Sequence, residues 1–576
     1  MSSGIIPGVI RGLGRARIKF DLAYKNKKIG KANAKKFLFL EKLNLKEKEF
    51  SRSALFKTLK HFSDPEIDEV LFWTVLKLIN AEEVGGLCVP KSDLIKFILE
   101  KNPSLEIEKS WKNYFAVNRD NSLLFEEEEM IYLTYLYHTE VAVCDHLREF
   151  FDFKFKDKFK VYKDKNLSEE QVTIVNTIFQ NSISFLSGGP GTGKTTIIQA
   201  ILRSGIENGI APESIAILAP TGKAAKRLRE SCQSLLTKEQ SLQAPSTIHR
   251  FLGYNPSSGK YKFNAENPIQ KKLIIIDESS MIDVFILKAL LEAFPNADKD
   301  KRIIFVGDPD QLLSVNSGSV FSDFILLNKN VFKLTRSFRQ TSEGEEIKSL
   351  AREIQSLNSE DNLGLLLRNI SIRKELTQIS SGVSFFETSK DEETVNLALL
   401  WYKQIANLGD SSQILTPYNE TKIGVKNLNP FLETEIAKTS LANYKLPVIV
   451  NTNLYSMELF NGETGYLVEA NGSYSFLSTE KKPVPIPSSY RQYFDSAYAI
   501  TIHKSQGSEY EHVCILIPSE MENPDSLLNV RILYTGITRA KKSVTLIGSL
   551  ALFQKALLNR GEERHSRIGA RLKQTK

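Results

Sequence analysis

The sequence predicts an α/β protein with two parallel-sheet domains, a helical N-terminal domain, and a small β-module inserted in the second sheet domain. Its 576 residues, of which 41% are hydrophobic and 25% charged, are typical of a globular protein of several domains. From about residue 167, short apolar segments alternate with helical patterns, and these segments lack the polar–apolar alternation of half-exposed strands. Strands of this kind are buried on both faces, as in a parallel sheet covered by helices.

The first 36 residues are strongly basic, because they hold ten Lys or Arg residues against a single acid, Asp21. We expect residues 1–36 to form a flexible N-terminus. An arm that touches nucleic acid, an unstructured tail, a start codon assigned too far upstream and an organelle transit peptide all fit this composition. The net charge of the whole chain, +8, is only a mild preference for polyanions.

Residues 37–150 are expected to form a helical domain, either a docking surface for partner proteins or a packed accessory domain. Apolar residues at three- and four-residue spacings predict amphipathic helices over 68–79 and 131–147. The acidic run 126–129 would begin the second helix, where negative charge suits the helix dipole. A lysine-rich linker is expected over 151–166.

The two sheet domains are expected over residues 167–350 and 351–576. The strands predicted in the first are Ile183–Leu186, Ile215–Leu218, Leu273–Ile276 and Ile303–Val306. Those predicted in the second are Ser384–Phe386, Gln413–Leu415, Val513–Ile517 and Val544–Ile547. The β-module is expected at about 430–490, because the Asn-Gly pairs at 461–462 and 471–472 favour tight hairpin turns.

A glycine-rich run between the first predicted strand and the following helix fits the phosphate-binding pattern G-x-x-x-x-G-K-[ST]. Its glycines let several backbone N–H groups point at phosphate oxygens, and the helix that follows adds its dipole. Lys194 would reach the β and γ phosphates of ATP, and the Thr195 hydroxyl would bind Mg²⁺. The residues predicted to bind the nucleotide here are Gly188, Gly189, Pro190, Gly191, Thr192, Gly193, Lys194, Thr195 and Thr196.

Two carboxylates, Asp277 and Glu278, follow the apolar strand Leu273–Ile276. Ligands bind at this carboxyl edge of a parallel sheet. Asp277 would hold Mg²⁺ through water, and Glu278 would orient and deprotonate the attacking water. Because the sequence has no N-K-x-D guanine signature, an ATPase is favoured over a GTPase.

Six further segments accompany these motifs in a fixed order, at 218–228, 246–250, 305–311, 334–340, 501–509 and 534–540. In this order they resemble the motif series of superfamily 1 helicases, over about 167–548. The wording at 246–250 (Ser-Thr-Ile-His-Arg), 503–510 (His-Lys-Ser-Gln-Gly-Ser-Glu-Tyr) and 534–542 (Tyr-Thr-Gly-Ile-Thr-Arg-Ala-Lys-Lys) is most similar to RecD, the alpha subunit of exodeoxyribonuclease V, the RecBCD complex.

This resemblance implies two RecA-like motor domains and an ATP- and Mg²⁺-dependent 5′→3′ DNA helicase. It also implies RecB-like and RecC-like partners in a heterotrimer that acts in double-strand break repair and recombination, with the nuclease in another subunit. Two alternatives remain: a stand-alone superfamily 1 helicase acting on DNA or RNA, and a binding subunit that uses nucleotide only for assembly. Only the 2′-hydroxyl distinguishes RNA from DNA at a phosphate-reading site.

The resemblance also implies roles for individual residues. Gln171 would read the adenine edge, Gln311 would sense the γ-phosphate, and Glu509 would bond the ribose. Arg339 and Arg539 would be arginine fingers, unless they only pair with carboxylates. The predicted strand contacts, which suit phosphates rather than bases, are Pro220, Thr221, Thr247 and His249 in the first motor domain and Thr501, His503 and Lys504 in the second. Residues 254–268 resemble a strand-separating pin hairpin, or form a plain surface loop.

Some functions are disfavoured by what the sequence lacks. The four cysteines, Cys88, Cys144, Cys232 and Cys514, are far apart and form no C-x-x-C pair, which fits a reducing, cytoplasmic setting. No apolar run approaches the roughly 18 residues of a membrane span, so no membrane partner is expected. The sequence also has no acidic cluster typical of a nuclease metal site.

Overall fold

The computed structural model describes most of the chain from residue 68 onward. The described residues are 68–117, 123–151, 153–155, 159–294, 301–336, 344–357, 363–368, 370–373, 375–376, 379, 381–405, 411–438, 445–470, 473–478, 483–524 and 527–573. The basic segment 1–36 and the first part of the N-terminal domain therefore lie outside the described residues.

The first motor domain is built on a parallel sheet, as the unbroken apolar runs predicted. Its strands, in spatial order, are β11 (Val331–Leu334), β4 (Ile183–Gly188), β10 (Arg302–Gly307), β9 (Leu273–Ile276), β5 (Ile215–Ala219) and β6 (Ser246–Thr247). Strands β4, β5, β9 and β10 are buried along their whole length. Burial on both faces explains their composition, because each face packs against helices.

The helices of the first motor domain connect these strands. They are α8 (Glu169–Ile178), α9 (Lys194–Glu207), α10 (Gly222–Ser231), α11 (Gln233–Lys238), α12 (Ile248–Phe251), α13 (Val284–Glu292) and α14 (Val320–Leu327). A short antiparallel hairpin of β7 (Tyr254–Asn255) and β8 (Lys260–Tyr261) follows α12, within the segment 254–268.

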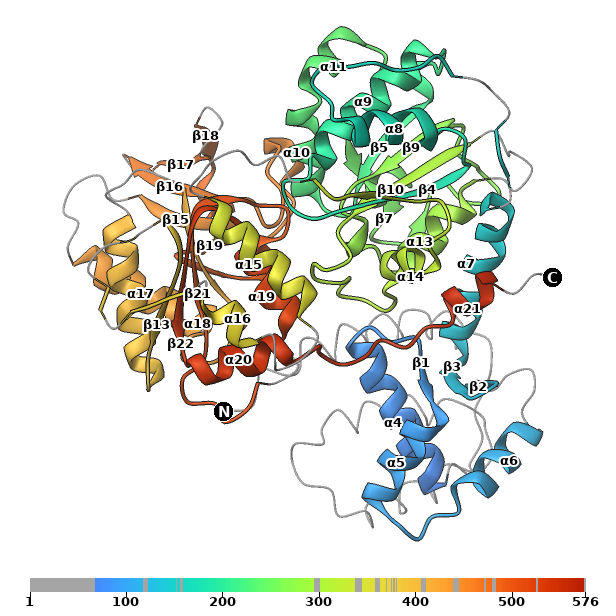
Figure 1. Ribbon diagram of the computed structural model, residues 1–576, viewed down its shortest axis with the longest axis horizontal. Coiled ribbons are helices and arrows are strands. Elements are labelled where there is room, and N and C mark those ends of the chain that lie inside the picture. The colour runs from blue at the N-terminus through green and yellow to red at the C-terminus, as the bar shows by residue number, and fades with distance from the viewer. Residues whose placement is uncertain are drawn as a thin grey trace.

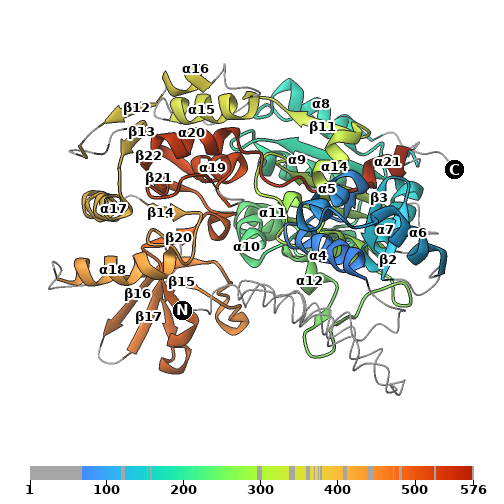
Figure 2. The same cartoon turned by 90° about the horizontal axis from the view of Figure 1, so that it is seen from below.

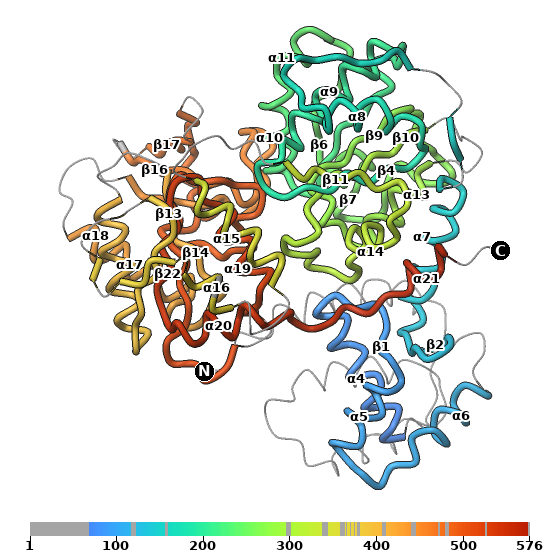
Figure 3. The backbone as a smooth tube through the Cα atoms, viewed as in Figure 1, coloured from blue at the N-terminus to red at the C-terminus, as the bar shows by residue number. Residues whose placement is uncertain are grey.

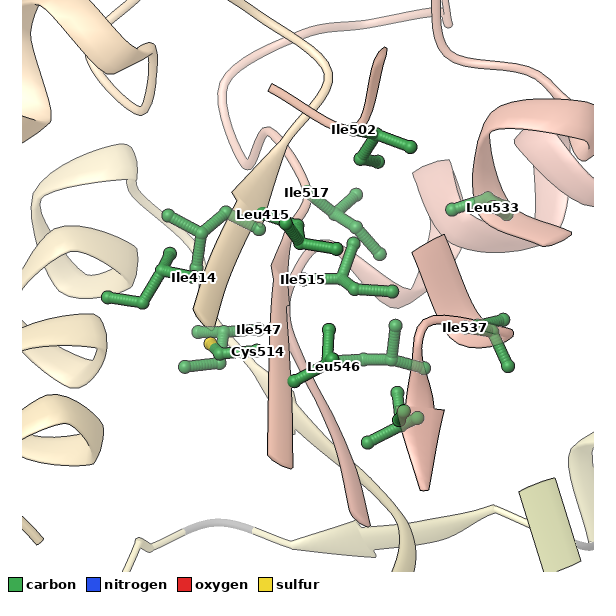
Figure 4. Packing of buried hydrophobic residues seen from close by; sticks show 14 of the residues in the cluster. Ile414, Leu415, Ile502, Cys514, Ile515, Ile517, Leu533, Ile537, Leu546 and Ile547 are labelled. Carbon is green, nitrogen blue, oxygen red and sulfur yellow. The ribbon is translucent and has the colours of Figure 1, made fainter. Parts of the chain in front are cut away.

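The second motor domain also has a parallel sheet. Its strands, in spatial order, are β12 (Ser371–Arg373), β13 (Gly382–Glu387), β22 (Ala540–Gly548), β21 (Tyr510–Leu516), β14 (Ser412–Thr416) and β20 (Ala499–Thr501). Its helices are α15 (Glu345–Ser356), α16 (Leu363–Arg368), α17 (Asp391–Ile405), α18 (Val425–Ala437), α19 (Val530–Ile537) and α20 (Leu550–Leu558). Figure 4 shows apolar side chains of β14, β21 and β22 packing toward Leu533 and Ile537 of α19.

The β-module is an antiparallel sheet between α18 and β20. Its strands are β15 (Leu446–Val450), β16 (Thr464–Ala470), β17 (Ser473–Leu477), β18 (Val484–Ile486) and β19 (Phe494–Ser496), in the spatial order β18-β17-β16-β15-β19. It has its own core around Phe476 and Phe494. Figure 2 shows it on the side of the second motor domain away from α15 and α16.

The boundary expected for this module, about 430–490, is wrong at both ends. Residues 430–437 belong to α18, and β19 extends the sheet to Ser496. Asn461-Gly462 lies in the longer connection between β15 and β16 rather than in a two-residue hairpin turn. The Asn471-Gly472 pair lies outside the described residues, between the paired residues Ala470 and Ser473.

The N-terminal domain is mixed rather than purely helical. It contains α4 (Glu69–Glu83), β1 (Cys88–Pro90), α5 (Lys91–Lys101), α6 (Ile107–Val117), β2 (Leu124–Glu127), β3 (Met130–Leu133) and α7 (Thr134–Phe151). The three strands form an antiparallel sheet in the order β1-β3-β2. The helix predicted at 68–79 is α4, with Asp68 as its N-cap.

The acidic run 126–129 does not begin a helix, contrary to expectation. Glu126 and Glu127 end β2, Glu128 adopts a left-handed turn conformation with φ 53°, and α7 starts only at Thr134. The apolar residues of 131–133 therefore belong to strand β3. A short strand that runs directly into a helix shows no break in its apolar pattern, which explains the error.

Two domain boundaries also differ from those expected. Helix α15 begins at Glu345 and packs in the core of the second motor domain, although residues up to 350 were assigned to the first. After α20, the chain leaves the second motor domain, and α21 (Ile568–Lys573) packs on α7 and α14. Figure 3 shows this C-terminal segment running past the N-terminal domain to α7.

The three parts lie in contact. Figure 1 shows the first motor domain (green) beside the second (yellow to red), with the N-terminal domain (blue) below the first. Backbone bonds join the C-terminal segment to the start of β1, since the N–H groups of Leu87 and Cys88 donate to His565 O at 2.9 Å and 3.4 Å. The edge where β4, β9 and β10 end faces helix α19 of the second motor domain, as the contacts below show.

Candidate nucleotide site and strand-contact motifs

The phosphate-binding loop connects β4 to α9. Gly191 (φ 74°) and Gly193 (φ 83°) are left-handed, a conformation that favours glycine because a Cβ is strained there. Gly193 is the N-cap of α9, so the unpaired N–H groups of the first helical turn point into the loop. Thr192 Oγ1 donates to Gly189 O at 2.8 Å, which closes the loop from within.

The ammonium group of Lys194 lies over this loop. Its Nζ donates to Gly188 O at 2.7 Å and to Gly189 O at 3.0 Å. Thr195 lies beside it in the first turn of α9, half-buried, and Thr196 is exposed. The structure therefore brings together the lysine, the hydroxyl and the glycine-rich backbone that the sequence predicted to hold phosphate.

Asp277 and Glu278 follow β9 directly. Burial and the adjacent Glu278 carboxylate raise the pKa of Asp277 above its usual range, while Lys194 lowers it. Glu278 has φ 53°, a left-handed conformation that costs a side chain of this size of the order of 1–3 kcal/mol. Strain of this kind gathers at functional sites, because the surrounding structure must hold it in place.

Gln311 lies beside the carboxylate of Asp308, which follows β10. Its Nε2 donates to Asp308 Oδ2 at 2.9 Å, and both side chains are buried. The same oxygen accepts from the Tyr534 hydroxyl of α19 at 3.2 Å. A Cβ on Gly189 would lie 3.4 Å from the Tyr534 hydroxyl oxygen. The phosphate loop and Gln311 therefore face the second motor domain.

Arg539 follows α19, the helix that carries Tyr534. Its Nε donates to Thr535 O at 3.1 Å and its Nη1 to Ser508 O at 3.2 Å, and the side chain is buried. These bonds hold it within the second motor domain, a few residues after Tyr534, whose hydroxyl contacts the first. The other predicted finger, Arg339, lies outside the described residues.

Glu509 also lies at the interface of the motor domains. Its Oε2 pairs with Arg227 of α10 at 3.1 Å, and Arg227 Nη1 donates to Gly507 O at 3.3 Å. Burial lowers the pKa of Arg227, but the carboxylates of Glu509 and Glu278 more than offset this. Arg227 is thus a neighbour of Glu509, the residue expected to bond the ribose, and the motifs in the sequence did not indicate this contact.

Gln171, expected to read adenine, caps the helix that carries it. Its Oε1 accepts from Ser168 N–H at 3.0 Å, while Ser168 Oγ accepts from Gln171 N–H at 3.3 Å, a reciprocal capping box. The side chain is buried rather than a solvent-exposed helix glutamine. With Oε1 occupied in this way, the amide N–H₂ remains a donor group for a base edge.

All three hydroxyls among the predicted strand contacts are local caps. Thr221 Oγ1 accepts from Ala224 N–H at 3.2 Å, and Thr247 Oγ1 accepts from Arg250 N–H at 3.2 Å. Thr501 Oγ1 accepts from Lys504 N–H at 3.3 Å. A hydroxyl that accepts a cap bond keeps its own O–H as a donor, so each can also serve a phosphate oxygen.

The other predicted strand contacts have different surroundings. Pro220 is half-buried between β5 and α10, and Lys504 is exposed. Burial, aided by the charge of Arg564, lowers the pKa of His503, which favours the neutral ring. His249 packs edge-on against Tyr254 of the β7–β8 hairpin, with ring centroids 5.4 Å apart.

The structure adds three residues to those expected at the interface: Arg227, Asp308 and Tyr534. All three lie inside motifs that were recognised, at 218–228, 305–311 and 534–540. The motifs therefore marked the segments that hold these three residues, but the roles of the residues depend on contacts between the two motor domains. Sequence spacing does not show such contacts.

Among the described residues, no group of three or more His, Cys, Asp or Glu side chains could hold a metal ion. The four cysteines are buried and free. Within the same part of the chain, every helix is too short or too polar to cross a membrane.

Comparison with known proteins identifies the two motor domains. A family described as an AAA domain matches residues 171–317, and one described as a UvrD-like helicase C-terminal domain matches 496–547. The RecBCD enzyme subunit RecD of Mycobacterium tuberculosis is 27% identical over 88% of this chain and 92% of its own length. That of Buchnera aphidicola is 27% identical over 75% and 82%.

Together these matches support a RecD-like superfamily 1 helicase. The ATP-dependent RecD2 DNA helicase of Deinococcus radiodurans is also similar, at 28% identity over 79% of this chain and 61% of that protein. Among solved structures, Bacteroides Pif1 bound to single-stranded DNA matches 66% of this chain and 92% of its own, at 19% identity and a TM-score of 0.39. Candida albicans Pif1 matches 70% and 97%, at 16% identity and a TM-score of 0.40.

Proposed function

We propose that this RecD-like chain is an ATP-driven 5′→3′ DNA translocase and helicase that hydrolyses ATP between its two motor domains. The observation that carries the proposal is the contact of Tyr534 with Asp308 and the Gly189 loop. It brings the helix that leads to Arg539 against the phosphate end of the first motor domain. Nucleotide bound there would touch both domains, so its cleavage can change how they fit together.

The residues present suit Mg²⁺ as the cofactor. A threonine hydroxyl and a carboxylate, Thr195 and Asp277, are oxygen ligands of the kind that Mg²⁺ prefers together with phosphate oxygens and water. The raised pKa of Asp277, caused by burial and by Glu278, supports this, because a cation would relieve the crowding of two carboxylates. The metal would neutralise charge that develops on the phosphates.

Hydrolysis itself is assigned to side chains at this edge of the sheet. Glu278 would orient and deprotonate the attacking water, and Gln311 would hold the γ-phosphate end. Arg539, with Arg339, would stabilise the transferring phosphoryl group, an effect of roughly 10³–10⁵ in rate. Lys194 would bind the β and γ phosphates throughout.

Movement along a strand would follow from this arrangement. The capping hydroxyls of Thr221 and Thr247 belong to the first motor domain, and those of Thr501 and its neighbour Lys504 belong to the second. Two sets of phosphate contacts on domains that open and close would grip the strand alternately. Hydroxyl donors contact phosphates without reading bases, which suits a motor that tracks any sequence.

We further propose that the chain works as the RecD subunit of a RecBCD-type complex, with RecB-like and RecC-like partners, in double-strand break repair and recombination. The chain covers 82% and 92% of the two RecD subunits above but only 61% of the stand-alone RecD2 helicase. The similarity to these RecD subunits over 75% and 88% of this chain supports that role. The nuclease activity of such a complex would belong to another subunit.

The test is unwinding of DNA duplexes with a 5′ or a 3′ single-stranded tail, by the chain alone and with candidate partner subunits. We expect ATP-dependent unwinding of the 5′-tailed substrate only. The Lys194→Gln variant should bind DNA but hydrolyse ATP at least 10²-fold more slowly, because the phosphates lose their cation. Full ATPase activity in this variant would refute the assigned site.

A competition assay addresses the RNA alternative. Unlabelled DNA and RNA strands of the same sequence would compete for the protein during DNA-stimulated ATP hydrolysis. If the DNA strand competes for the protein more strongly than RNA and stimulates ATP hydrolysis more strongly, the DNA role is supported. Equal competition and equal stimulation by RNA would favour a helicase that accepts both.

A further inference from the structure

The hydroxyl of Tyr534 is the centre of a hydrogen-bonded ring that crosses between the motor domains. It donates to Asp308 Oδ2 of the first domain at 3.2 Å and accepts from Gln355 Nε2 of α15 at 2.9 Å. Gln355 Nε2 also donates to Asp310 Oδ2, back in the first domain, at 2.8 Å. Asp310 N–H donates to Asp308 Oδ1 at 3.1 Å, which closes the ring, so the ring spans the interface twice.

One member of this ring also holds the expected γ-phosphate sensor. Asp308 Oδ2, which accepts from Tyr534, accepts from Gln311 Nε2 at 2.9 Å. Asp308, Gln311 and Tyr534 are 1%, 5% and 2% exposed, so water competes little for these bonds. In such surroundings a hydrogen bond to a carboxylate is strong and directional.

From these contacts we propose that Tyr534 is a positioning residue, which sets the orientation of Gln311 through Asp308 only when the two motor domains are closed. This rests on the proposed ATP-driven function. Its phenol oxygen is supplied by α19, so any rotation of the second domain away from the first removes a donor from Asp308. Gln311 is then less firmly held.

The position of Tyr534 in its helix connects this effect to the arginine finger. Tyr534 lies in α19, and Arg539 follows the end of that helix at Ile537. Closure that brings the Tyr534 hydroxyl to Asp308 therefore also moves Arg539 toward the phosphate loop. Movement of α19 as one rigid element would thus bring the Arg539 cation to the γ-phosphate and, at the same time, orient Gln311 on the opposite side of that phosphate.

A simple packing role for Tyr534 gives a different expectation. Other contacts also hold the interface, since Arg531 Nη1 donates to Pro309 O at 2.6 Å and Leu312 N–H donates to Thr535 Oγ1 at 3.1 Å. If Tyr534 only added packing, ATP hydrolysis would depend on its ring and not on its hydroxyl. Changing Tyr534 to phenylalanine separates the two, because it removes the oxygen and keeps the ring.

The experiment measures steady-state ATP hydrolysis at saturating single-stranded DNA for the wild-type chain, Tyr534→Phe, Asp308→Asn and the double variant. We expect kcat to fall by about tenfold in Tyr534→Phe with KM for ATP within about twofold, the effect of losing one hydrogen bond to a carboxylate. Because both changes act on the same bond, one by removing its donor and the other by removing the carboxylate charge of its acceptor, the double variant should be no slower than the slower single variant. Tyr402→Phe is the control, a tyrosine on α17 that packs edge-on against Tyr498.

Each result decides the proposal. Unchanged kcat in Tyr534→Phe, or a double variant slower by the product of the two single effects, would overturn it. A lower melting temperature together with a lower kcat and a higher KM for ATP would assign Tyr534 a packing role. That result would also overturn the proposal. Absence of DNA-stimulated hydrolysis in the wild-type chain would instead refute the proposed function, so the two failures are distinguishable.

Discussion

Asp323 on α14 is a carboxylate whose surroundings change its protonation. Its Oδ2 accepts from Ser566 Oγ of the C-terminal segment at 2.9 Å. Burial raises the pKa of Asp323 to about 7, and the negative charge of Glu140 adds to this. The hydroxyl bond works in the other direction, but it does not compensate for the loss of water. The charged form is therefore the unfavourable one in the folded protein.

The Asp323→Asn variant should be more stable than the wild type at pH 8 and about equally stable at pH 4. In the unfolded chain Asp323 titrates near pH 3.9, so between about pH 4 and 7 the folded state binds more protons. Wild-type stability is then lost as the pH rises through this window, and asparagine removes that loss. Melting temperatures of both proteins from pH 4 to 8 test this. Asp145→Asn, which removes an exposed carboxylate from α7, is the control, and a pH-independent difference at Asp323 would contradict the prediction.

At the scale of elements, helix α21 connects the end of the chain to the N-terminal domain. Arg571 Nε donates to Glu140 Oε1 at 2.7 Å, and its Nη1 donates to Glu127 Oε1 at 2.8 Å. Arg567 adds bonds to Glu127 and Glu128, each at 2.6 Å. The acidic residues at the end of β2 and in the turn after it therefore bind two arginines more than 400 residues away in sequence, Arg567 just before α21 and Arg571 within it.

Arg571→Met should lower stability by about 3 kcal/mol, because Glu140 is completely buried and would lose its cation. Differential scanning calorimetry and limited proteolysis of the C-terminal segment would measure this. Lys573→Met is the matched control, since Lys573 is exposed on the same helix. The double variant Arg571→Met, Glu140→Leu should recover much of the loss, as buried ion pairs can be replaced by apolar groups. Equal effects of Arg571→Met and Lys573→Met would show that the pair contributes little.

At the scale of the whole molecule, many cations near the proposed strand path are already paired. On α10, Lys226 pairs with Glu463 of the β-module, Arg227 with Glu509, and Arg229 with Glu458. These pairs bridge the first motor domain to the second. The proposed strand contacts are mainly hydroxyls, together with Lys504 and a histidine held neutral by burial.

Binding of single-stranded DNA should therefore depend weakly on salt. Each phosphate neutralised on a single strand contributes about −0.7 to the slope of log affinity against log salt. With one or two cations engaged, we expect a slope of about −0.7 to −1.4, so affinity would fall about 3- to 7-fold between 50 and 200 mM salt. Fluorescence anisotropy with a labelled strand measures this, and Lys504→Gln should reduce the slope. A slope of −4 or steeper would mean that the α10 cations leave their carboxylates to bind DNA.

Residue types in a recognised order, such as the glycines before Lys194, predicted the phosphate loop because local backbone geometry alone requires them. The four inner strands of each motor sheet were predicted, since burial on both faces leaves a continuous apolar run, but the edge strands β6, β11, β12 and β20 were not. The β2–β3 hairpin was missed because its short strand merges with the apolar pattern of α7.

By itself, the sequence determined the two parallel sheets, the phosphate loop and the carboxylates after β9, because each depends on residues close together in the chain. Only the tertiary structure decided that Tyr534 meets Asp308, that Arg227 meets Glu509, and that α21 returns to α7. These contacts join residues that are far apart in sequence. Burial and charge at the surfaces where folded elements meet determine which residues pair. Local sequence patterns do not show these pairs, because they reflect only residues that are close together in the chain.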